Sequence, residues 1–455
     1  MRKNRLTSTP WRREPRTTWK LACKSVVVAL VIAAARGCPA GLAQQAETVT
    51  IERALQIARE SNLDILAARQ ELEIARGRLV EASYPNRFNP EVGAEAGRRR
   101  LGGGRGATDF GVSLSQELEV GGQRGKRLGE ARINLDRVEQ LIRDQVRLVE
   151  ADLKKAFFTA LNRRQRLDLF RRVEDLNRRL RDASSARVRA GEVPVMEANL
   201  AEIRLGQSRK DTLGAERDHA VAILALKQLL SVRPEVSLEP SGDLRFSPST
   251  YDFGDVLACA TRTRPDLLAG QREVARVTAD AALTRRLVIP NPTIEGFYRE
   301  EGGAEGRDRI AGGGIRIPLP VFDRRQAELV ALAGRRTQAR LEVDRTRGAI
   351  EQEVAEALRA YESARQESAI FEQDVLARAD ENFRFIETAF REGKIDLLQL
   401  IVVQNDLVAA QFSYLDSLTN LRLAQVDLER AVGVETLEGL GNEHSVSHSA
   451  ATQAD

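Results

Sequence analysis

Apolar residues follow a helical rhythm through residues 126–190, which contain no proline and one glycine. They recur mostly at steps of three and four, which is the spacing of a coiled-coil seam. The positions are Leu128, Ala131, Leu135, Val138, Ile142, Val146, Val149, Leu153, Ala156, Ala160, Phe170, Val173, Leu176 and Leu180. One helix of this length spans about 95 Å at roughly 1.5 Å per residue. A similar pattern over residues 324–390 predicts a second long helix.

Both long patterns end in the same kind of turn, Arg-x-Gly, and Gly393 of the second turn lies 202 residues after Gly191 of the first. Nearly the same offset recurs in sequence order along the chain. Leu55 corresponds to Leu257, Asp64 to Asp266, residues 88–90 to 290–292, 116–120 to 317–321 (here at 201) and 228–231 to 430–433. This order predicts an internal repeat, which we place at residues 44–240 and 241–433.

Each repeat is predicted to open with one helix. The helical pattern starts near Ile51 in the first copy and near Phe253 in the second, and it stops before Pro85 and Pro290. A proline disfavours the helical conformation of the residue before it, so a helix usually ends there. Together with the long helices, this pattern predicts a fold that is mainly α with a small β part.

Between the helices the apolar period changes from 3.6 to 2, which predicts strands with one apolar and one polar face. The clearer strands cover residues 110–120 and 311–321, and fainter partners precede them at 91–98 and 293–299. We expect the strand at 311–321 to end early, because two prolines fall near its end. Glycine-rich, charged segments join the partners and predict exposed hairpin loops. Each unit therefore reads helix, strand, strand, long helix, turn, helix.

Composition agrees with long helices, since charged residues make up 30% of the chain and aromatic residues only 5%. The sequence pI near 9.0 is a property of the N-terminus. Residues 1–43 hold nine Lys or Arg and one acid, which leaves 61 basic and 65 acidic residues in the remainder. We therefore expect no nucleic-acid partner.

Residues 1–43 have the pattern of a secretory signal: a basic leader, an apolar run and small residues before a cut after Ala43. The apolar run is too short to cross a bilayer as a helix, and no later segment has 18 consecutive apolar residues. Cys38 offers an alternative, a lipid anchor, but Arg36 stands where such a signal needs a small uncharged residue. After cleavage only Cys259 remains, which excludes an internal disulfide.

Four strands of about ten residues with alternating faces suit a lipid-facing wall, but a membrane barrel needs about eight strands or more. Unpaired strand edges in lipid cost several kcal/mol per group, so the chain must associate if these strands enter a membrane. Three copies supply twelve strands, together with six long helices for a tube about 100 Å long. This architecture predicts an outer-membrane duct that reaches into the periplasm.

The chain resembles the TolC-type outer-membrane efflux family over nearly all of its mature length. The resemblance lies in the doubled unit, the Asn-Pro corners before the strands, the strand exits at 118–124 and 318–325, and the tips at 189–194 and 390–396. It implies a homotrimer with a twelve-stranded β-barrel in outer-membrane lipid and a periplasmic α-helical barrel. It also implies docking to a periplasmic adaptor and an inner-membrane pump of the RND type. The strand exits look most like the branch for cobalt–zinc–cadmium efflux.

The two tip turns are the functional candidates that this resemblance implies. Glycine permits the tight reversal between antiparallel helices, and in the family these turns form the periplasmic end where the duct closes and the adaptor docks. The candidates for docking are Arg189, Gly191, Pro194, Arg391, Gly393 and Asp396. The alternative is that the glycines serve the turns alone and that Asp396 caps the following helix.

Six residues beyond each glycine, the family often places an acidic residue that lines the constriction. These positions hold Glu197 and Gln399, so the first fits that pattern and the second departs from it. Three copies of Glu197 at one level would attract cations and repel one another, as in an electrostatic gate. An ordinary solvated helix carboxylate is the alternative interpretation.

No catalytic or metal-binding set is visible, so we expect neither an enzyme nor a cofactor. The three histidines, His219, His444 and His448, pair with no cysteine or acidic cluster, and the last two lie in residues 434–455, a polar tail that we expect to be disordered. The alternatives to a metal efflux duct are a duct for drugs or secreted proteins and a periplasmic coiled-coil protein without a pore. The last does not explain the repeated strand pairs.

Overall fold

A computed structural model describes residues 47–100, 106–303, 306–372, 378, 381–382, 385, 388–389, 394–395 and 397–437. The predicted signal segment, the lipid-anchor candidate Cys38 and the histidines of the tail lie outside the described residues. Arg391, Gly393 and Asp396 of the second tip also lie outside them. In the described part of the chain, no helix is both long enough and apolar enough to cross a lipid bilayer.

The described elements repeat in the predicted order. The first copy comprises β1 (Glu47–Val49), α1 (Ile51–Ser61), α2 (Leu63–Ser83), β2 (Glu91–Arg100), β3 (Gly106–Glu117), α3 (Gln123–Arg189), α4 (Val195–Leu229) and β4 (Leu238–Pro240). The second comprises α5 (Phe253–Thr263), α6 (Pro265–Leu287), β5 (Thr293–Gly302), β6 (Arg307–Arg316), α7 (Gln326–Ile370) and α9 (Leu397–Val432). The fold is mainly helical with a small sheet part, as predicted. The strand predicted over residues 311–321 ends early, because β6 stops at Arg316, before the two prolines.

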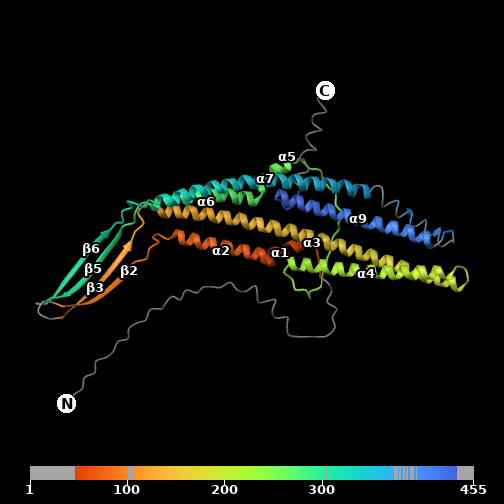
Figure 1. Cartoon of the computed structure of the whole chain (residues 1–455), viewed down its shortest axis with the longest axis horizontal. Helices are drawn as coiled ribbons and strands as arrows, with labels where there is room; N and C mark the ends of the chain where they lie inside the picture. Colours follow the sequence, from red (N-terminus) through yellow and green to blue (C-terminus); the bar gives the residue numbers. More distant parts are fainter. Residues whose placement is uncertain are drawn as a thin grey trace, which may run out of the picture. The chain divides into compact units, whose positions relative to one another are not determined.

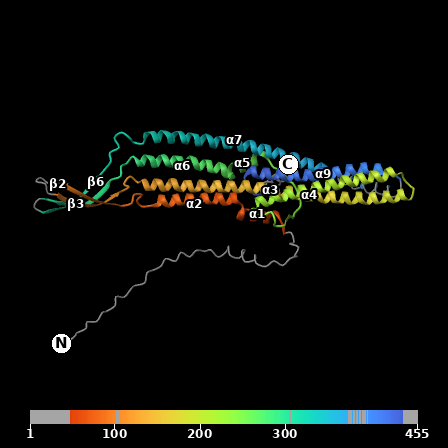
Figure 2. The same ribbon diagram turned by 60° about the horizontal axis from the view of Figure 1, so that its bottom comes forward.

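The helices pack side by side in the order α2, α3, α6, α7, and the sheet follows them at one end in the order β2, β3, β5, β6 (Figure 1). At the other end, α3 pairs with α4 and α7 with α9, and α3 also packs along α9. Figure 2 shows the same neighbours from a second side. The order leaves α2 and α7 at the edges of the helical layer and β2 and β6 at the edges of the sheet.

The sheet has one apolar and one polar face, as the alternation predicts. Antiparallel register sets Val92 opposite Leu114, Val112 opposite Tyr298, and Ile294 opposite Ile315, so these side chains share a face. That face is uncovered, and Val92 is 79% exposed. The other face carries ion pairs such as Arg299 with Glu95 at 2.9 Å.

Buried positions recur between the two copies with the same spacing. Ile65, Ala75 and Ala82 of α2 correspond to Leu267, Val277 and Thr284 of α6 at an offset of 202, and Val149, Leu153, Phe157 and Leu167 of α3 correspond to Ile350, Val354, Leu358 and Ser368 at 201. Residues 371 and 372, directly after α7, are π-helical. A π-helical turn holds one residue more than an α-helical turn, and the offset returns to 202 beyond it.

The prediction of one opening helix per repeat is wrong, because each is broken in two. Asn62 separates α1 from α2, and its extended backbone lets its side chain accept hydrogen bonds from two backbone N–H groups of α2. Arg264 separates α5 from α6 because it precedes Pro265, which disfavours a helical conformation at Arg264.

The two breaks fasten the end of the last helix in each repeat in the same way. Ser61 and Asn62 donate to the carbonyls of Leu230 and Leu229, both at 2.8 Å. At an offset of 202, Thr263 donates to the carbonyl of Val432 at 2.9 Å and Arg264 to that of Ala431 at 3.1 Å. We call these two groups the first and second joint. Each satisfies helix C-terminal carbonyls that lack partners within the helix.

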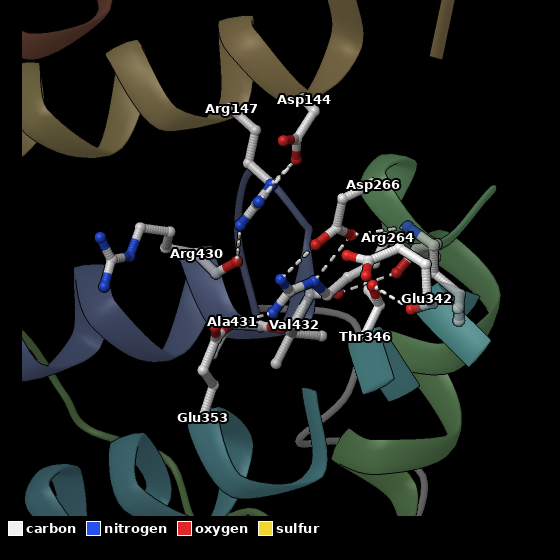
Figure 3. A network of polar contacts seen from close by, with 12 residues as sticks. Asp144, Arg147, Arg264, Asp266, Glu342, Thr346, Glu353, Arg430, Ala431 and Val432 are labelled. Carbon is white, nitrogen blue, oxygen red and sulfur yellow. Dashed lines mark hydrogen bonds and ion pairs between the residues drawn. The ribbon is translucent and has the colours of Figure 1, made fainter. Parts of the chain in front are cut away.

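The second joint is the more highly charged (Figure 3). The guanidinium of Arg264, whose side chain is 5% exposed, lies 2.5 Å from Asp266 and 2.5 Å from Glu353 of α7. Burial disfavours the Asp266 carboxylate, but the hydrogen bond and charge of Arg264 outweigh it and keep the pKa of Asp266 below its usual range. Arg147 of α3 adds a hydrogen bond to the carbonyl of Arg430 at 2.5 Å.

Each joint is followed by a residue with a left-handed backbone. Gly433 has φ +82° and Ser231, its counterpart in the first repeat, has φ +53°. A side chain at such a φ is strained, so the first repeat carries a cost that the second avoids. Beyond Gly433 the packed chain continues past the predicted start of the tail, since Leu437 is 1% exposed.

The linker between the repeats is held by Arg422 of α9. Its guanidinium donates to the carbonyls of Asp243, Leu244 and Arg245 at 3.4, 2.9 and 2.9 Å, and it lies 3.9 Å from the centre of the Phe246 ring. The preceding strand β4 pairs in parallel with β1, a contact that the sequence pattern did not predict.

Candidate functional site

The first hairpin tip is a helix ending built around glycine. Gly191 has φ +75°, its N–H donates to the carbonyl of Val188, and the N–H of Glu192 donates to that of Arg187, both at 3.0 Å. This pair of bonds is the Schellman ending, which requires a left-handed residue after the helix. The predicted conformational reason for glycine at this tip is confirmed, and Pro194 then precedes the first residue of α4.

The second tip repeats one of these bonds. The N–H of Lys394 donates to the carbonyl of Ala389 at 2.8 Å, which corresponds to the bond between Glu192 and Arg187 at an offset of 202. The two tips therefore share this backbone bond, although the predicted docking residues of the second tip lie outside the described part of the chain.

Glu197 is neither a free nor a fully solvated carboxylate. It lies in the first turn of α4, its side chain is 17% exposed, and its Oε1 atom lies 3.2 Å from Nη1 of Arg187 on α3. The ion pair closes the hairpin just above the turn and cancels the Glu197 charge within one chain. Arg187 was not among the predicted residues. The signal was available, because residues equidistant from a helical turn face each other.

Gln399, the second constriction candidate, is exposed in the first turn of α9. The residues after it, Leu400 and Ile401, are buried with Ala201 of α4 in a small apolar cluster. This cluster attaches the start of α9, in the α7–α9 hairpin, to α4 of the α3–α4 hairpin. The structure therefore brings the Glu197 and Gln399 segments together through their buried neighbours.

Apolar packing between α3 and α9, which includes the Phe170 and Phe412 rings 4.5 Å apart, lies between this cluster and the sheet end and is accompanied by a polar contact. The polar contact comprises Lys154 with Glu429 at 2.6 Å, Lys155 with Asp427 at 2.5 Å, Arg166 with Asp416 at 2.8 Å, Asn162 with Thr419 at 2.8 Å and Gln404 with Asn177 at 3.3 Å. Burial raises the pKa of Glu429, although Lys154 opposes the shift.

The remaining candidates for chemistry are unremarkable in the part of the chain that the structure describes. Cys259 is a buried free thiol on α5. Among the described residues, no group of three or more His, Cys, Asp or Glu side chains is arranged to hold a metal ion.

Comparison with known proteins matches this architecture. The family model described as outer membrane efflux protein matches twice, over residues 54–232 and 257–434. The cobalt-zinc-cadmium resistance protein CzcC of Cupriavidus metallidurans is 25% identical over 395 residues, which cover 86% of this chain and 91% of that protein. The outer membrane efflux protein BepC of Brucella suis is 23% identical over 433 residues, 92% of each chain. The fold is similar to that of the Campylobacter jejuni CmeC outer membrane channel, with a TM-score of 0.69, 14% identity and 88% of each chain covered.

Proposed function

Because the chain belongs to the outer membrane efflux protein family, we propose that it is the exit duct of a tripartite efflux system that exports divalent heavy-metal cations. In this proposal three copies form the duct, residues 1–43 direct each copy out of the cytoplasm, and the helical tips meet a periplasmic adaptor and an RND-type inner-membrane pump. As a member of this family, the chain is an outer-membrane transport protein and not an enzyme.

The open edges of the sheet support a trimer. Strands β2 and β6 each pair on one side only within the described chain. Unsatisfied strand edges are costly in lipid, and barrels that span membranes close with about eight strands or more. Joining β6 of one copy to β2 of the next keeps the strands antiparallel, and three copies of four strands close the circle with an even number.

The charge of the polar face supports a cation as cargo. In a closed trimer the apolar face meets lipid and the polar face lines the duct. On the described strands that polar face carries the acids Glu91, Glu95, Asp109, Glu117, Glu295, Glu301 and Asp308 against the bases Arg99, Arg299 and Arg316. A wall with an excess of carboxylates attracts cations and repels anions.

The similarity to CzcC supports the heavy-metal assignment, since that relative is a cobalt-zinc-cadmium resistance protein and the match covers most of both chains. This similarity is the observation that carries the substrate proposal. The family alone fits ducts for drugs or secreted proteins equally well.

The tips support a gate and a docking site at the periplasmic end. The same backbone bond is present at both tips, so in this proposal each copy offers both tips to an adaptor. In the proposed resting state, Arg187 neutralises Glu197, so the constriction does not depend on three repelling carboxylates.

Deletion of the gene tests the substrate. The deletion strain should lose tolerance to cobalt, zinc and cadmium and regain it with the wild-type gene, while its tolerance to hydrophobic drugs stays unchanged. Loss of drug tolerance alone would contradict the metal assignment but keep the duct. Purified protein that forms no channels in planar bilayers would contradict the duct itself and favour a coiled-coil protein without a pore.

A further inference from the structure

The apolar face of the sheet changes character along its strands. Near the helices it carries Val92, Ala94, Ala96, Phe110, Val112, Leu114, Ile294, Tyr298, Ala311 and Ile315. At the hairpin end, farthest from the helices, the same face carries four arginines, Arg98 and Arg100 on β2 and Arg307 and Arg309 on β6. A band of apolar side chains therefore ends in a basic rim.

Only one carboxylate faces these arginines on the described strands. Glu300 lies 3.4 Å from Arg307 and 3.2 Å from Arg309, and it also accepts a hydrogen bond from the Tyr298 hydroxyl at 2.8 Å. Arg98 and Arg100 are exposed and form no ion pair with any described residue. The rim therefore keeps an excess of positive charge.

The intervening residue of the same strand behaves differently. Arg99 points to the polar face, where it lies 3.3 Å from Asp109 and 3.6 Å from Glu301. The described arginines on the polar face are thus each paired with an acid, whereas the four on the apolar face have one carboxylate between them, that of Glu300. The unbalanced charge is a property of the face and not of the arginine-rich segment as a whole.

The position of the arginines on the two edge strands concentrates the charge further. If copies join as proposed, β6 of one copy lies next to β2 of the following copy, which places two pairs of arginines side by side on the outward face. Like charges on neighbouring strands destabilise the sheet. An anion between them removes that cost, and guanidinium groups bind phosphate in bidentate fashion.

We propose that this basic rim binds the phosphate groups of an anionic lipid in the outer leaflet of the outer membrane. The adjoining apolar band favours a lipid over free phosphate, because one molecule then places its chains on the band and its phosphates on the rim. The inference rests on the proposed function, since it requires the apolar face to meet lipid and the hairpin end to lie outermost.

The test titrates lipid A carrying two phosphates into the detergent-purified full-length mature protein and follows the melting temperature, which gives an apparent affinity by linkage. The test variant is Arg98→Ala/Arg100→Ala. The matched control is Arg99→Ala/Arg316→Ala, which removes the same charge from the polar face. Lipid A stripped of phosphate and inorganic phosphate serve as comparison ligands, and single-channel recordings of all three proteins check that the duct forms.

The test variant should bind lipid A roughly 25-fold more weakly, about fivefold for each arginine near a lipid surface. The control should stay within about threefold of the wild type. The inference would be overturned if both variants lost lipid A affinity equally, if the stripped lipid bound as well as lipid A, or if inorganic phosphate stabilised the protein to the same extent. Normal channels in the same recordings would leave the proposed duct intact. Absence of channels in the wild type would overturn both.

Discussion

Arg264→Ala is the substitution whose effect is best determined by the structure. The variant loses the hydrogen bond to the Ala431 carbonyl at 3.1 Å and the ion pairs to Asp266 and Glu353 at 2.5 Å. A hydrogen bond from a charged donor contributes roughly 1.5 kcal/mol. The partly buried pair with Asp266 adds about 1 kcal/mol, and the pair with the half-exposed Glu353 adds no more than ~0.5 kcal/mol. The expected loss of stability is about 3 kcal/mol.

The first joint provides matched comparisons. Asn62→Ala removes a helix cap and one carbonyl bond, which cost about 2 kcal/mol together. Arg264→Asn gives the second joint the side chain of the first and should cost about 1 kcal/mol, because a cap and a carbonyl bond replace the charges. For a protein of this size, the melting temperature measured by circular dichroism should fall by roughly 1 °C for each kcal/mol of unfolding free energy lost.

The pH dependence isolates the charged part of the effect. Because Arg264 holds the pKa of Asp266 below its usual value, this stabilisation is present above the unfolded pKa near ~4 and is lost as the pH falls through the folded pKa. The difference between Arg264→Ala and wild type should therefore shrink below about pH 4. A variant that melts within about 1 °C of wild type at pH 7 would refute the reasoning.

Three further predictions follow from strained, clamped and paired residues. Ser231→Gly should raise stability by about 1 kcal/mol because it relieves a left-handed backbone, while Gly433→Ala should lower it, since the new Cβ would lie 3.0 Å from a neighbouring side chain; both are measured by thermal melting. In Arg422→Met, limited proteolysis should cleave the linker between the repeats at least tenfold faster than in the wild type, because three linker carbonyls lose a charged donor. An unchanged cleavage rate would show that Arg422 does not hold the linker. Arg187→Ala should increase the cation preference of the channel in planar bilayers, and adding Glu197→Gln should abolish that increase; no change in the single variant would place the pair away from the ion path.

The periodicity of apolar residues predicted most of the fold because the pattern of each element occurs twice, once in each repeat. The strands around Val112 and Ile315 were predicted with the correct faces, and Gly191 with its correct backbone. The breaks at Asn62 and Arg264 were missed because the apolar rhythm continues across them and only the backbone changes. Asn62 is a good helix cap and Arg264 precedes a proline, so the local signals were present but weaker than the pattern around them.

The candidate site was harder to predict than the fold. Glu197 was identified through the position that the family resemblance implies. Its partner Arg187 lies on the preceding helix, and it emerges only when residues equally far from the turn on the two helices are compared. The basic rim of the sheet was hidden for a similar reason. Arg98, Arg99 and Arg100 form one run in the sequence, and only the strand register separates Arg99 from its neighbours.

The π-helical turn at residues 371 and 372 has a consequence for how this chain tolerates changes of length. An extra residue within an α-helix rotates everything beyond it by about 100°, which would turn a buried seam toward solvent. Here the offset between repeats is 201 at Ser368 and 202 at Ala389, and the turn lies between them. A hybrid that takes the second hairpin from a relative should therefore keep its packing when the two sequences are joined at Phe371. The same one-residue difference in length placed inside α7 would rotate the rest of the helix and expose its buried residues.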